Sequence, residues 1–184
     1  MTRKRKIIVY ITISADGFIA RPDGSVDWLD RPRPKGGYGW GAFYQSIDTT
    51  LWGRKTCDMA LDYQKRGVPG TNFDTRVKNY VFTRSLQQSA APKGVEFVDE
   101  SIKAFATRLR AKKGKDIWIM GGAGIIASFL DEGEIDEFII NLIPIFIGEG
   151  IPLIAPRHRA VPLTLISSKK FGDGVVKLHY AVHK

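Results

Sequence analysis

A glycine-rich turn is the part of this sequence whose residue types most directly suggest chemistry. Gly121-Gly122-Ala123-Gly124 joins an apolar segment, Ile117–Met120, to the apolar pair Ile125-Ile126. If a strand runs into a helix here, the free N–H groups and the dipole of the first helical turn would bind a phosphate, and glycines would let it approach the backbone. A tight turn needing positive φ angles would use the same glycines. The spacing also differs from the Rossmann fingerprint, so both interpretations stay open.

Two further junctions carry residue types that bind polyanions. In Gly53-Arg54-Lys55-Thr56 a glycine again follows an apolar segment, and the guanidinium and hydroxyl groups suit a phosphate. Cations at a helix N-terminus oppose the helix dipole, so an anionic partner would account for them, although a solvated first turn is the alternative. Thr83-Arg84-Ser85 ends another apolar segment with groups that suit a 2′-phosphate.

The elements that would position these junctions follow from hydrophobic patterning. Lys6–Ser14 is apolar and β-branched, which predicts a central strand buried on both faces. We expect further strands at Thr49–Trp52, Val77–Thr83, Val95–Val98, Asp116–Met120 and Glu134–Ile143, helices at Ala42–Ser46, Arg54–Leu61 and Ala123–Leu130, a helix capped by Ser101 that runs to Lys112, and a hairpin of Leu163–Lys170 with Val175–His183. This order predicts a three-layer α/β domain with a mostly parallel sheet and an antiparallel C-terminal hairpin.

Composition limits the classes of protein to consider. The chain has 184 residues, 43% hydrophobic and 26% charged, which fits one domain over residues 1–184 with residues 1–5 as a disordered basic tail. Its apolar runs are too short to cross a membrane, and no secretion signal is evident. One cysteine, Cys57, excludes an internal disulfide, and three scattered histidines give no metal-ligand spacing. We therefore expect a cytoplasmic protein without a metal.

The net charge of +9 raises the question of nucleic-acid binding. The basic residues are spread along the chain, and aromatic residues do not alternate with them as stacking platforms would require. We expect no nucleic-acid partner, but a basic surface that attracts an anionic small molecule.

The three junctions, in this order, resemble the dihydrofolate reductase fold, and the resemblance covers the whole chain. In that family a Gly-Arg-x-Thr turn, a hydroxyl-rich strand end and a Gly-Gly turn hold NADPH, and the Gly-Gly peptide bond is cis. The resemblance implies a cofactor site made of Gly17, Ile19, Gly53, Arg54, Lys55, Thr56, Thr83, Arg84, Ser85, Met120, Gly121, Gly122, Ala123, Gly124 and Ile125. The positive charge of Arg54, Arg84 and Lys55 exceeds what a diphosphate needs, which favours NADPH over NADH.

Two more segments narrow the resemblance to one branch. Ile13–Ala20 contains Ser-x-Asp-Gly-x-Ile-Ala, which is similar to the end of strand one in the reductase domain of riboflavin biosynthesis proteins, and Gly148–Leu153 points the same way. The resemblance implies a stand-alone reductase in which residues Asp23–Trp28 form a lid over the nicotinamide. It also implies a homodimer; Phe138–Ile147 and the terminal hairpin would supply the interface, unless Phe138–Ile147 is an ordinary buried strand.

The chain also departs from its relatives. Gly37–Phe43 lacks the acidic residue with which dihydrofolate reductases bind the pterin ring, and Met120 stands where riboflavin reductases usually have glutamate. The ligands of a fused zinc deaminase cannot be built from one cysteine. The sequence therefore leaves the physiological substrate open.

The candidate catalytic and substrate residues come from the expected mouth of strand one. Asp27 and Asp16 are candidate proton donors, although Asp27 equally suits a cap of the segment at Trp28. Trp28, Trp40 and Phe43 are candidate walls of a substrate pocket, with core packing as the alternative. The leading hypothesis is an NADPH-dependent reductase acting on a small heterocyclic or carbonyl-type substrate, such as a ribosylated pyrimidine or a pterin-like molecule. The alternative is an NADP(H)-binding protein of the same fold without turnover.

Overall fold

A computed structural model describes residues 3–68, 73–83, 91–157 and 159–183. Within these ranges, eight strands form one sheet in the order β5-β4-β3-β6-β1-β7-β10-β9, and β2 pairs with β8 in a second, small sheet. The elements, in chain order, are β1 (Ile7–Ser14), β2 (Phe18–Ala20), the 3-10 helix η1 (Asp27–Leu29), α1 (Trp40–Gln45), β3 (Ile47–Gly53), α2 (Arg54–Lys65), β4 (Lys78–Phe82), β5 (Val95–Val98), α3 (Ile102–Ala111), β6 (Asp116–Gly121), α4 (Ala123–Asp131), β7 (Glu137–Ile143), β8 (Ile151–Pro152), β9 (Leu163–Lys170) and β10 (Val176–Val182).

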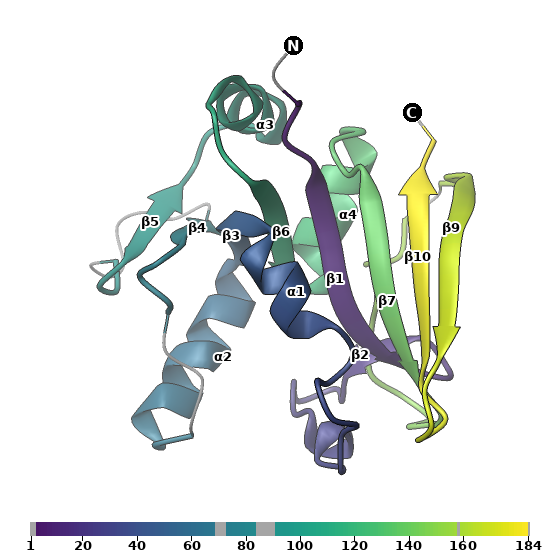
Figure 1. Cartoon of the computed structure of the whole chain (residues 1–184). Coiled ribbons are helices and arrows are strands. Elements are labelled where there is room, and N and C mark those ends of the chain that lie inside the picture. The colour runs from purple at the N-terminus through teal and green to yellow at the C-terminus, as the bar shows by residue number, and fades with distance from the viewer. Residues whose placement is uncertain (1–2, 69–72, 84–90, 158, 184) are drawn as a thin grey trace.

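Strand β1 lies in the middle of the sheet, as the sequence predicts. It pairs in parallel with β6 on one side and with β7 on the other. The pairs β3–β4, β3–β6 and β4–β5 are also parallel, whereas β10 is antiparallel to both β7 and β9. In Figure 1 the arrows of β1 and β7 therefore point one way and that of β10 the other. The predicted fold class, a mostly parallel sheet with an antiparallel C-terminal hairpin, is confirmed.

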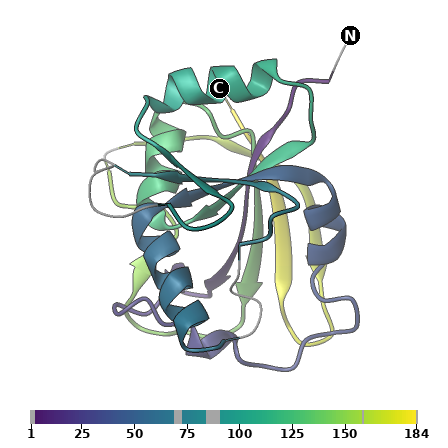
Figure 2. The same ribbon diagram turned by 90° about the vertical axis from the view of Figure 1, so that its left-hand side faces the viewer.

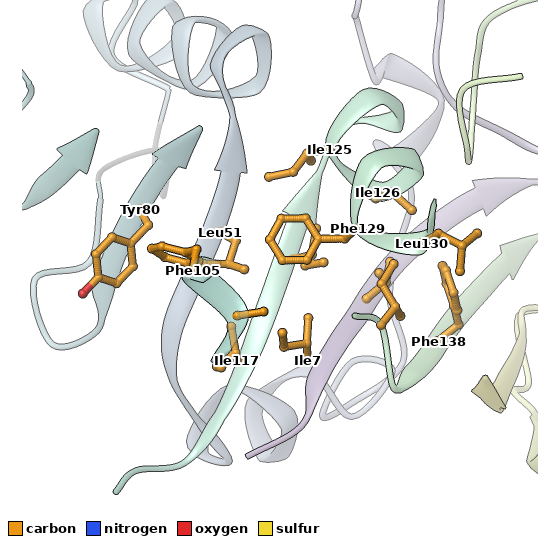
Figure 3. Close-up of a cluster of buried hydrophobic side chains, with 14 of the residues drawn as sticks. Ile7, Leu51, Tyr80, Phe105, Ile117, Ile125, Ile126, Phe129, Leu130 and Phe138 are labelled. Atoms are coloured by element: carbon orange, nitrogen blue, oxygen red, sulfur yellow. The ribbon is translucent and has the colours of Figure 1, made fainter. Parts of the chain in front are cut away.

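The larger part of the core lies on the face of the sheet covered by α3 and α4. Phe105 and Phe129, from these helices, are fully buried, and Phe82 contacts both rings at centroid distances of 5.0 and 5.3 Å. Figure 3 shows Phe105 and Phe129 among side chains of the sheet such as Leu51 and Ile117. Aromatic rings bury large areas and gain from edge-to-face contacts, so this cluster holds the two helices on the sheet.

Helix α1 covers the opposite face, near β1 and β6. Phe43 of α1 stacks on Tyr10 of β1 at a centroid distance of 4.6 Å and meets Trp118 of β6 edge-on at 5.5 Å. The turned view in Figure 2 separates α1 from the helices on the other side of the sheet. Because successive side chains of β1 alternate between the two clusters, the strand is buried on both faces, which its apolar sequence predicts.

Helix ends agree closely with the sequence where a cap residue marks them. The Ser101 side chain accepts a hydrogen bond from the Ala104 N–H at 3.3 Å and starts α3, as predicted. Gly133 follows α4 with a φ of +67°, the left-handed conformation that favours glycine after a helix. Strands β2 and β8 were not predicted, because segments of two and three residues carry too little periodicity to be recognised.

The N-terminal segment corrects the prediction of a disordered basic tail over residues 1–5, of which the structure describes residues 3–5. Arg5 is only 5% exposed; its guanidinium donates to the Lys115 carbonyl at 2.6 Å and to the Thr49 hydroxyl at 2.9 Å, and it pairs with Asp48. A run of basic residues suggests solvation, but this guanidinium finds enough acceptors around the start of β1 to be buried.

Two smaller points complete the fold. Cys57 of α2 is 1% exposed, and burial raises the pKa of its thiol to about 11. Among the described residues, no helix has the length and apolar character needed to cross a membrane.

We expect Phe129→Ala to lower the free energy of unfolding by about 3–5 kcal/mol, because it removes a fully buried ring and leaves a cavity. Urea denaturation measures this change. Phe146→Ala is the matched control, since the Phe146 side chain is 79% exposed and its loss should change stability by no more than about 0.5 kcal/mol. A loss below about 1 kcal/mol for Phe129→Ala would contradict the packing described for α4.

Candidate functional site

Two of the glycine junctions meet at one edge of the sheet. Trp52, just before Gly53, is in register with Gly121, so β3 and β6 end side by side. A Cβ atom built on Gly53 would lie 3.5 Å from the Gly121 carbonyl oxygen, 3.5 Å from a methyl group of Ile125 and 3.6 Å from the Gly122 nitrogen. The two backbones are therefore close enough that a methyl group on Gly53 would touch the glycine turn.

The second glycine of the turn brings in two more predicted residues. A Cβ atom on Gly122 would lie 3.3 Å from the Thr56 hydroxyl oxygen and 3.8 Å from the Cδ1 atom of Ile19. The structure thus unites residues from β2, β3, α2, β6 and α4 around one point. The peptide bond between Gly121 and Gly122 is cis, as the resemblance to dihydrofolate reductases implies.

Helix α4 begins at this point with exposed polar backbone. Its N-cap residue, Gly122, provides no side chain to accept hydrogen bonds from the first turn. A Cβ atom on Gly124, in that first turn, would meet no atom within 4 Å. The first turn of α4 therefore has no side-chain cap and has open space beside Gly124, a combination that suits the binding of a phosphate by its N–H groups.

Helix α2 starts beside this point in the same way, after Gly53. Arg54 pairs with Asp58 at 2.8 Å and lies over the Phe97 ring, 5.1 Å from its centroid, so the guanidinium is held near the end of β5. Lys55 is exposed. These cations lie at the first turn of α2, as predicted.

The third junction is described only in part. The Thr83 N–H donates to the Val98 carbonyl at 3.0 Å, directly after β4. Arg84 and Ser85 lie outside the described residues, so their proposed role at a 2′-phosphate stays a prediction.

Asp16, one of the candidate proton donors, ties the end of β1 to a distant segment. Its carboxylate accepts hydrogen bonds from the Ser14 hydroxyl at 2.5 Å and from the N–H groups of Ile147 and Gly148 at 3.0 and 2.8 Å. The hydrogen bond from Ser14, with smaller help from those backbone groups, lowers the pKa of Asp16. A carboxyl group with a lowered pKa is ionised at neutral pH and holds no proton to donate, so the geometry favours a structural role.

The segment that follows Gly148 packs closely against β2. A Cβ atom on Gly150 would overlap the carbonyl oxygen of Ala20, and the Leu153 N–H donates to the Gly17 carbonyl at 3.0 Å. Gly17 itself has a φ of +89°. Gly150 is therefore required where the chain passes closely beside β2.

Asp27, the other candidate donor, starts η1 and lies on the surface. Its carboxylate pairs with Arg21 at 2.6 Å, and the hydrogen bond from this guanidinium lowers the pKa of Asp27. Its side chain is 61% exposed. The contacts of both predicted proton donors thus stabilise the ionised carboxylate. The assignment of either residue as the proton donor stays a prediction, and these contacts do not favour it.

A pocket of about 110 Å³ opens on the α1 side of β1 and β7. Strand residues form its floor, and the segment from η1 to α1 forms its wall. Its lining residues are Tyr10, Thr12, Leu29, Arg31, Arg33, Gly37, Tyr38, Trp40, Asn141 and Ile143. Ligands of parallel sheets bind at the carboxyl ends of strands, and this pocket lies along the same strand whose end carries Asp16 and Gly17.

Of the three aromatic residues predicted to line a substrate pocket, each lies in a different environment. Trp40 lines the pocket and is 47% exposed. Phe43 packs against Tyr10 and Trp118, beneath α1. Trp28 is 6% exposed and packs in a separate cluster, while its neighbour Leu29 lines the pocket.

Most of the pocket residues were not singled out from the sequence. Tyr10, Thr12 and Asn141 are polar interruptions in otherwise apolar strands, and this was the available signal. Met120, directly before the glycine turn, packs beside the Tyr10 and Trp118 cluster, on the pocket side of the sheet.

Within the described ranges, no group of three or more His, Cys, Asp or Glu side chains is arranged to hold a metal ion.

The chain matches the family described as RibD C-terminal domain over residues 5–177. It is 42% identical over 178 residues to Uncharacterized protein YwjB of Bacillus subtilis, covering 96% of this chain and 98% of that protein. A putative riboflavin biosynthesis protein from Shewanella sp. PV-4 has a similar structure, with a TM-score of 0.83, 28% identity and 97% and 99% of the two chains covered. Dihydrofolate reductase from Enterococcus faecalis, complexed with NADP(H) and RAB-propyl, has a TM-score of 0.65 at 14% identity with full coverage of both chains, which shows the shared fold alone.

We expect Asp16→Asn to destabilise the protein at pH 7, because the folded state holds this carboxylate ionised. The folded pKa is below the unfolded value of about 3.9, so the stabilisation is fully present above that value and is lost as the pH falls through the lower folded pKa. Urea unfolding of wild type and variant at pH 7, 5 and 3 measures the difference, which should shrink at the lowest pH. Asp30→Asn, at an exposed aspartate, is the control. A difference that stays constant with pH would contradict this role.

Proposed function

The chain belongs to the RibD C-terminal domain family, and on this premise we propose that it is an NADPH-dependent reductase. In this proposal a hydride passes to a small heterocyclic or carbonyl-type substrate, of which a ribosylated pyrimidine or a pterin-like molecule is the best candidate. The chemistry belongs to the cofactor, which supplies the hydride when bound. The protein supplies the binding site, the orientation and the exclusion of water.

The close approach of Gly53 to Gly121 and Gly122 is the observation that carries the proposal. It brings the N-terminal turns of α2 and α4 to one place, where two phosphates of a dinucleotide can be held by backbone N–H groups. The Thr56 hydroxyl lies at the same point and is able to donate to a phosphate oxygen. These residues therefore fit the diphosphate of a dinucleotide cofactor.

Arg54 and Lys55 support NADPH rather than NADH. Both cations lie at the first turn of α2, where they oppose the helix dipole and gain from an anionic ligand. Arg54 is directed toward the end of β5 by its contacts with Asp58 and Phe97. A guanidinium held in this way binds a phosphate in a fixed direction, which a 2′-phosphate requires.

The pocket beside β1 is the proposed substrate site. It shares β1 with the cofactor end of the site, and its walls carry Arg31 and Arg33, which favour an anionic substrate. Tyr38 and Trp40 provide aromatic surface for a planar ring. The pocket thus suits a small, planar and negatively charged molecule.

The homodimer stays a proposal as well. Strand β9 is exposed along its whole length, and Leu163, Leu165 and Ile166 are between 43% and 51% exposed. These apolar side chains lie on the edge strand of the sheet, where a second copy of the chain would cover them.

We expect Gly124→Asp to weaken NADPH binding at least about tenfold, because the new carboxylate would lie at the first turn of α4 and repel the phosphate. Titration of the tryptophan emission with NADPH measures the affinity, since Trp52 and Trp118 lie in β3 and β6 near the glycine turns. The variant should fold normally, because Gly124 has open space around it and an acidic residue favours a helix N-terminus.

Gly124→Asn is the matched control, since it has the same size without the charge and should bind NADPH more tightly than the aspartate variant. Equal affinities of the two variants would argue against a phosphate at this turn. The proposed reductase itself is tested by oxidation of NADPH in the presence of pterins, ribosylated pyrimidines and quinones. Tight cofactor binding without turnover on this panel would favour the binding protein over the enzyme.

We expect wild type to bind NADPH more tightly than NADH, and Arg54→Ala to reduce this preference by about tenfold, because a charged hydrogen bond to the 2′-phosphate is lost. Parallel titrations with the two cofactors give the ratio of dissociation constants. Lys65→Ala, at the exposed C-terminal end of α2, is the control that changes the net charge equally. A ratio unchanged in Arg54→Ala would remove this residue from the 2′-phosphate site.

A further inference from the structure

A second pocket lies on the face of the sheet that α3 and α4 cover, away from the proposed substrate site. Its volume is about 300 Å³, compared with about 110 Å³ for the pocket beside β1. Pockets that hold small molecules typically have volumes of about 300–1,000 Å³, so this pocket is at the lower end of that range. We call it the α4 pocket, because Leu130 of this helix forms part of its lining.

Strand β7 separates the α4 pocket from the pocket beside β1. Phe138 and Ile140 line the α4 pocket, whereas Asn141 and Ile143 line the other one. Since successive side chains of a strand point to opposite faces, the two pockets lie on opposite sides of the sheet. Within the described part of the chain, the two linings have no residue in common. A ligand in the α4 pocket would therefore leave the proposed substrate site open.

The outer wall of the α4 pocket includes a segment that runs along α4. The Ala155 N–H donates to the Ala123 carbonyl at 3.2 Å, at the start of the helix, and Arg157 pairs with Asp131 at its end. On the inner side are Leu130 and Phe138, which Figure 3 shows beside each other in the core cluster. The pocket is thus an apolar space between the packed core and this segment.

Among the described residues, the charged side chains that line the α4 pocket are both arginines. Arg157 is 46% exposed and Arg159 is 16% exposed. Both guanidinium groups pair with the carboxylate of Asp131, and Arg159 Nε lies 2.7 Å from one of its oxygens. One carboxylate between two guanidinium groups leaves one positive charge of this group uncompensated. This charge lies beside apolar side chains, where an anion gains most from it.

We propose that the α4 pocket binds a small carboxylic acid with an apolar body, whose carboxylate pairs with Arg157 and whose hydrocarbon part packs on Leu130 and Ile140. A guanidinium has five N–H donors, so Arg157 keeps donors for a ligand beside its contacts with Asp131 and Ser128. A carboxylate accepts two parallel hydrogen bonds from a guanidinium, and its single charge balances the uncompensated one. A phosphate dianion would exceed this charge and would cost more to desolvate beside apolar side chains.

A second copy of the chain is the competing occupant, because Leu163 belongs both to this pocket and to the exposed edge strand β9. Two copies in a closed dimer meet through the same surface. A dimer that buried the pocket itself would therefore bring together two groups of arginines with the same uncompensated charge. Repulsion between these groups disfavours a second copy as the occupant, whereas an anionic ligand gains from the same charge.

The test uses octanoate and 1-octanol, which share a hydrocarbon chain and differ in charge. Isothermal titration of the full-length protein gives both dissociation constants. We expect wild type to bind octanoate at least about tenfold more tightly than 1-octanol, because only the carboxylate accepts charged hydrogen bonds. Octanoate should also bind at least about tenfold more tightly than butanoate, whose shorter chain buries less apolar surface. Rising salt should reduce the preference for octanoate over 1-octanol, since it screens the ion pair.

Two variants separate the charge from the space. Arg157→Gln should lose most of the preference for octanoate over 1-octanol, whereas Arg66→Gln, at the exposed C-terminal end of α2, changes the net charge equally and should keep it. Ala155→Trp places a large ring in the pocket and should weaken the binding of both ligands at least about tenfold. Circular dichroism and thermal unfolding establish that each variant is folded before its affinities are compared.

The inference is overturned by an absence of octanoate binding to wild type, by equal affinities of wild type for octanoate and 1-octanol, or by an unchanged preference in Arg157→Gln. If octanoate does not bind and light scattering shows a dimer that Ala155→Trp dissociates, a second copy occupies the pocket instead. The inference does not depend on the proposed reductase, so Arg157→Gln should bind NADPH as wild type does. Weaker NADPH binding in this variant would assign Arg157 to the cofactor site and would likewise overturn the inference.

Discussion

The close approach of two backbones, at Gly53 and at Gly121–Gly122, is the constraint on which the rest of the site depends. A Cβ atom on Gly122 would lie 3.3 Å from the Thr56 hydroxyl oxygen, and Gly121 has a φ of +113° that favours glycine, whereas a Cβ atom on Gly53 would make ordinary van der Waals contacts. Because the strands are parallel, the helices that follow them start at the same edge and direct their N-termini into the same space. Backbone geometry, more than any charged side chain, is therefore the feature that suits this edge of the sheet to the phosphates of the proposed cofactor.

Strand β1 separates the apolar core under α3 and α4 from the side of the sheet that carries the pocket. Residues such as Ile7 and Val9 face the cluster under α3 and α4, while Tyr10 and Thr12 face α1 and the pocket. The strand is fixed at its start by the hydrogen bond from the Ile7 N–H to the Asp136 carboxylate, and at its end by the contacts of Asp16. A central strand that is held at both ends, with Tyr10 and Thr12 on one face, thus positions the proposed cofactor and substrate sites relative to each other.

Sequence patterns predicted what is local or repeated, and missed what depends on distant partners. The glycine turns, the central strand, the Ser101 cap and the C-terminal hairpin all follow from short segments whose residue types admit few conformations. Arg5 was misjudged because its acceptors come from residues more than forty positions away in the chain. For the same reason the pocket residues Tyr38 and Asn141 were not recognised, since neither has meaning until β1, β7 and the loop before α1 are placed together. Asp16 was seen, but its partners at Ile147 and Gly148 give it a structural role that its motif alone does not reveal.

The loop before α1 is anchored through both the main chain and the side chain of Tyr38. The Tyr38 carbonyl accepts from Tyr10 and Lys177, and its hydroxyl donates to the Asp173 carboxylate at 2.6 Å. The Tyr38 ring is also buried and meets the Phe171 ring at a centroid distance of 5.1 Å, so this attachment depends on a tyrosine at position 38. Arg31, Arg33 and Trp40 line the pocket from the same loop and the helix start. Arg31 shares this anchor, because its guanidinium donates to the Asp173 carbonyl at 2.8 Å. The residues that hold the loop in place therefore also shape the proposed substrate pocket, so a change at Tyr38 or Arg31 would alter both at once.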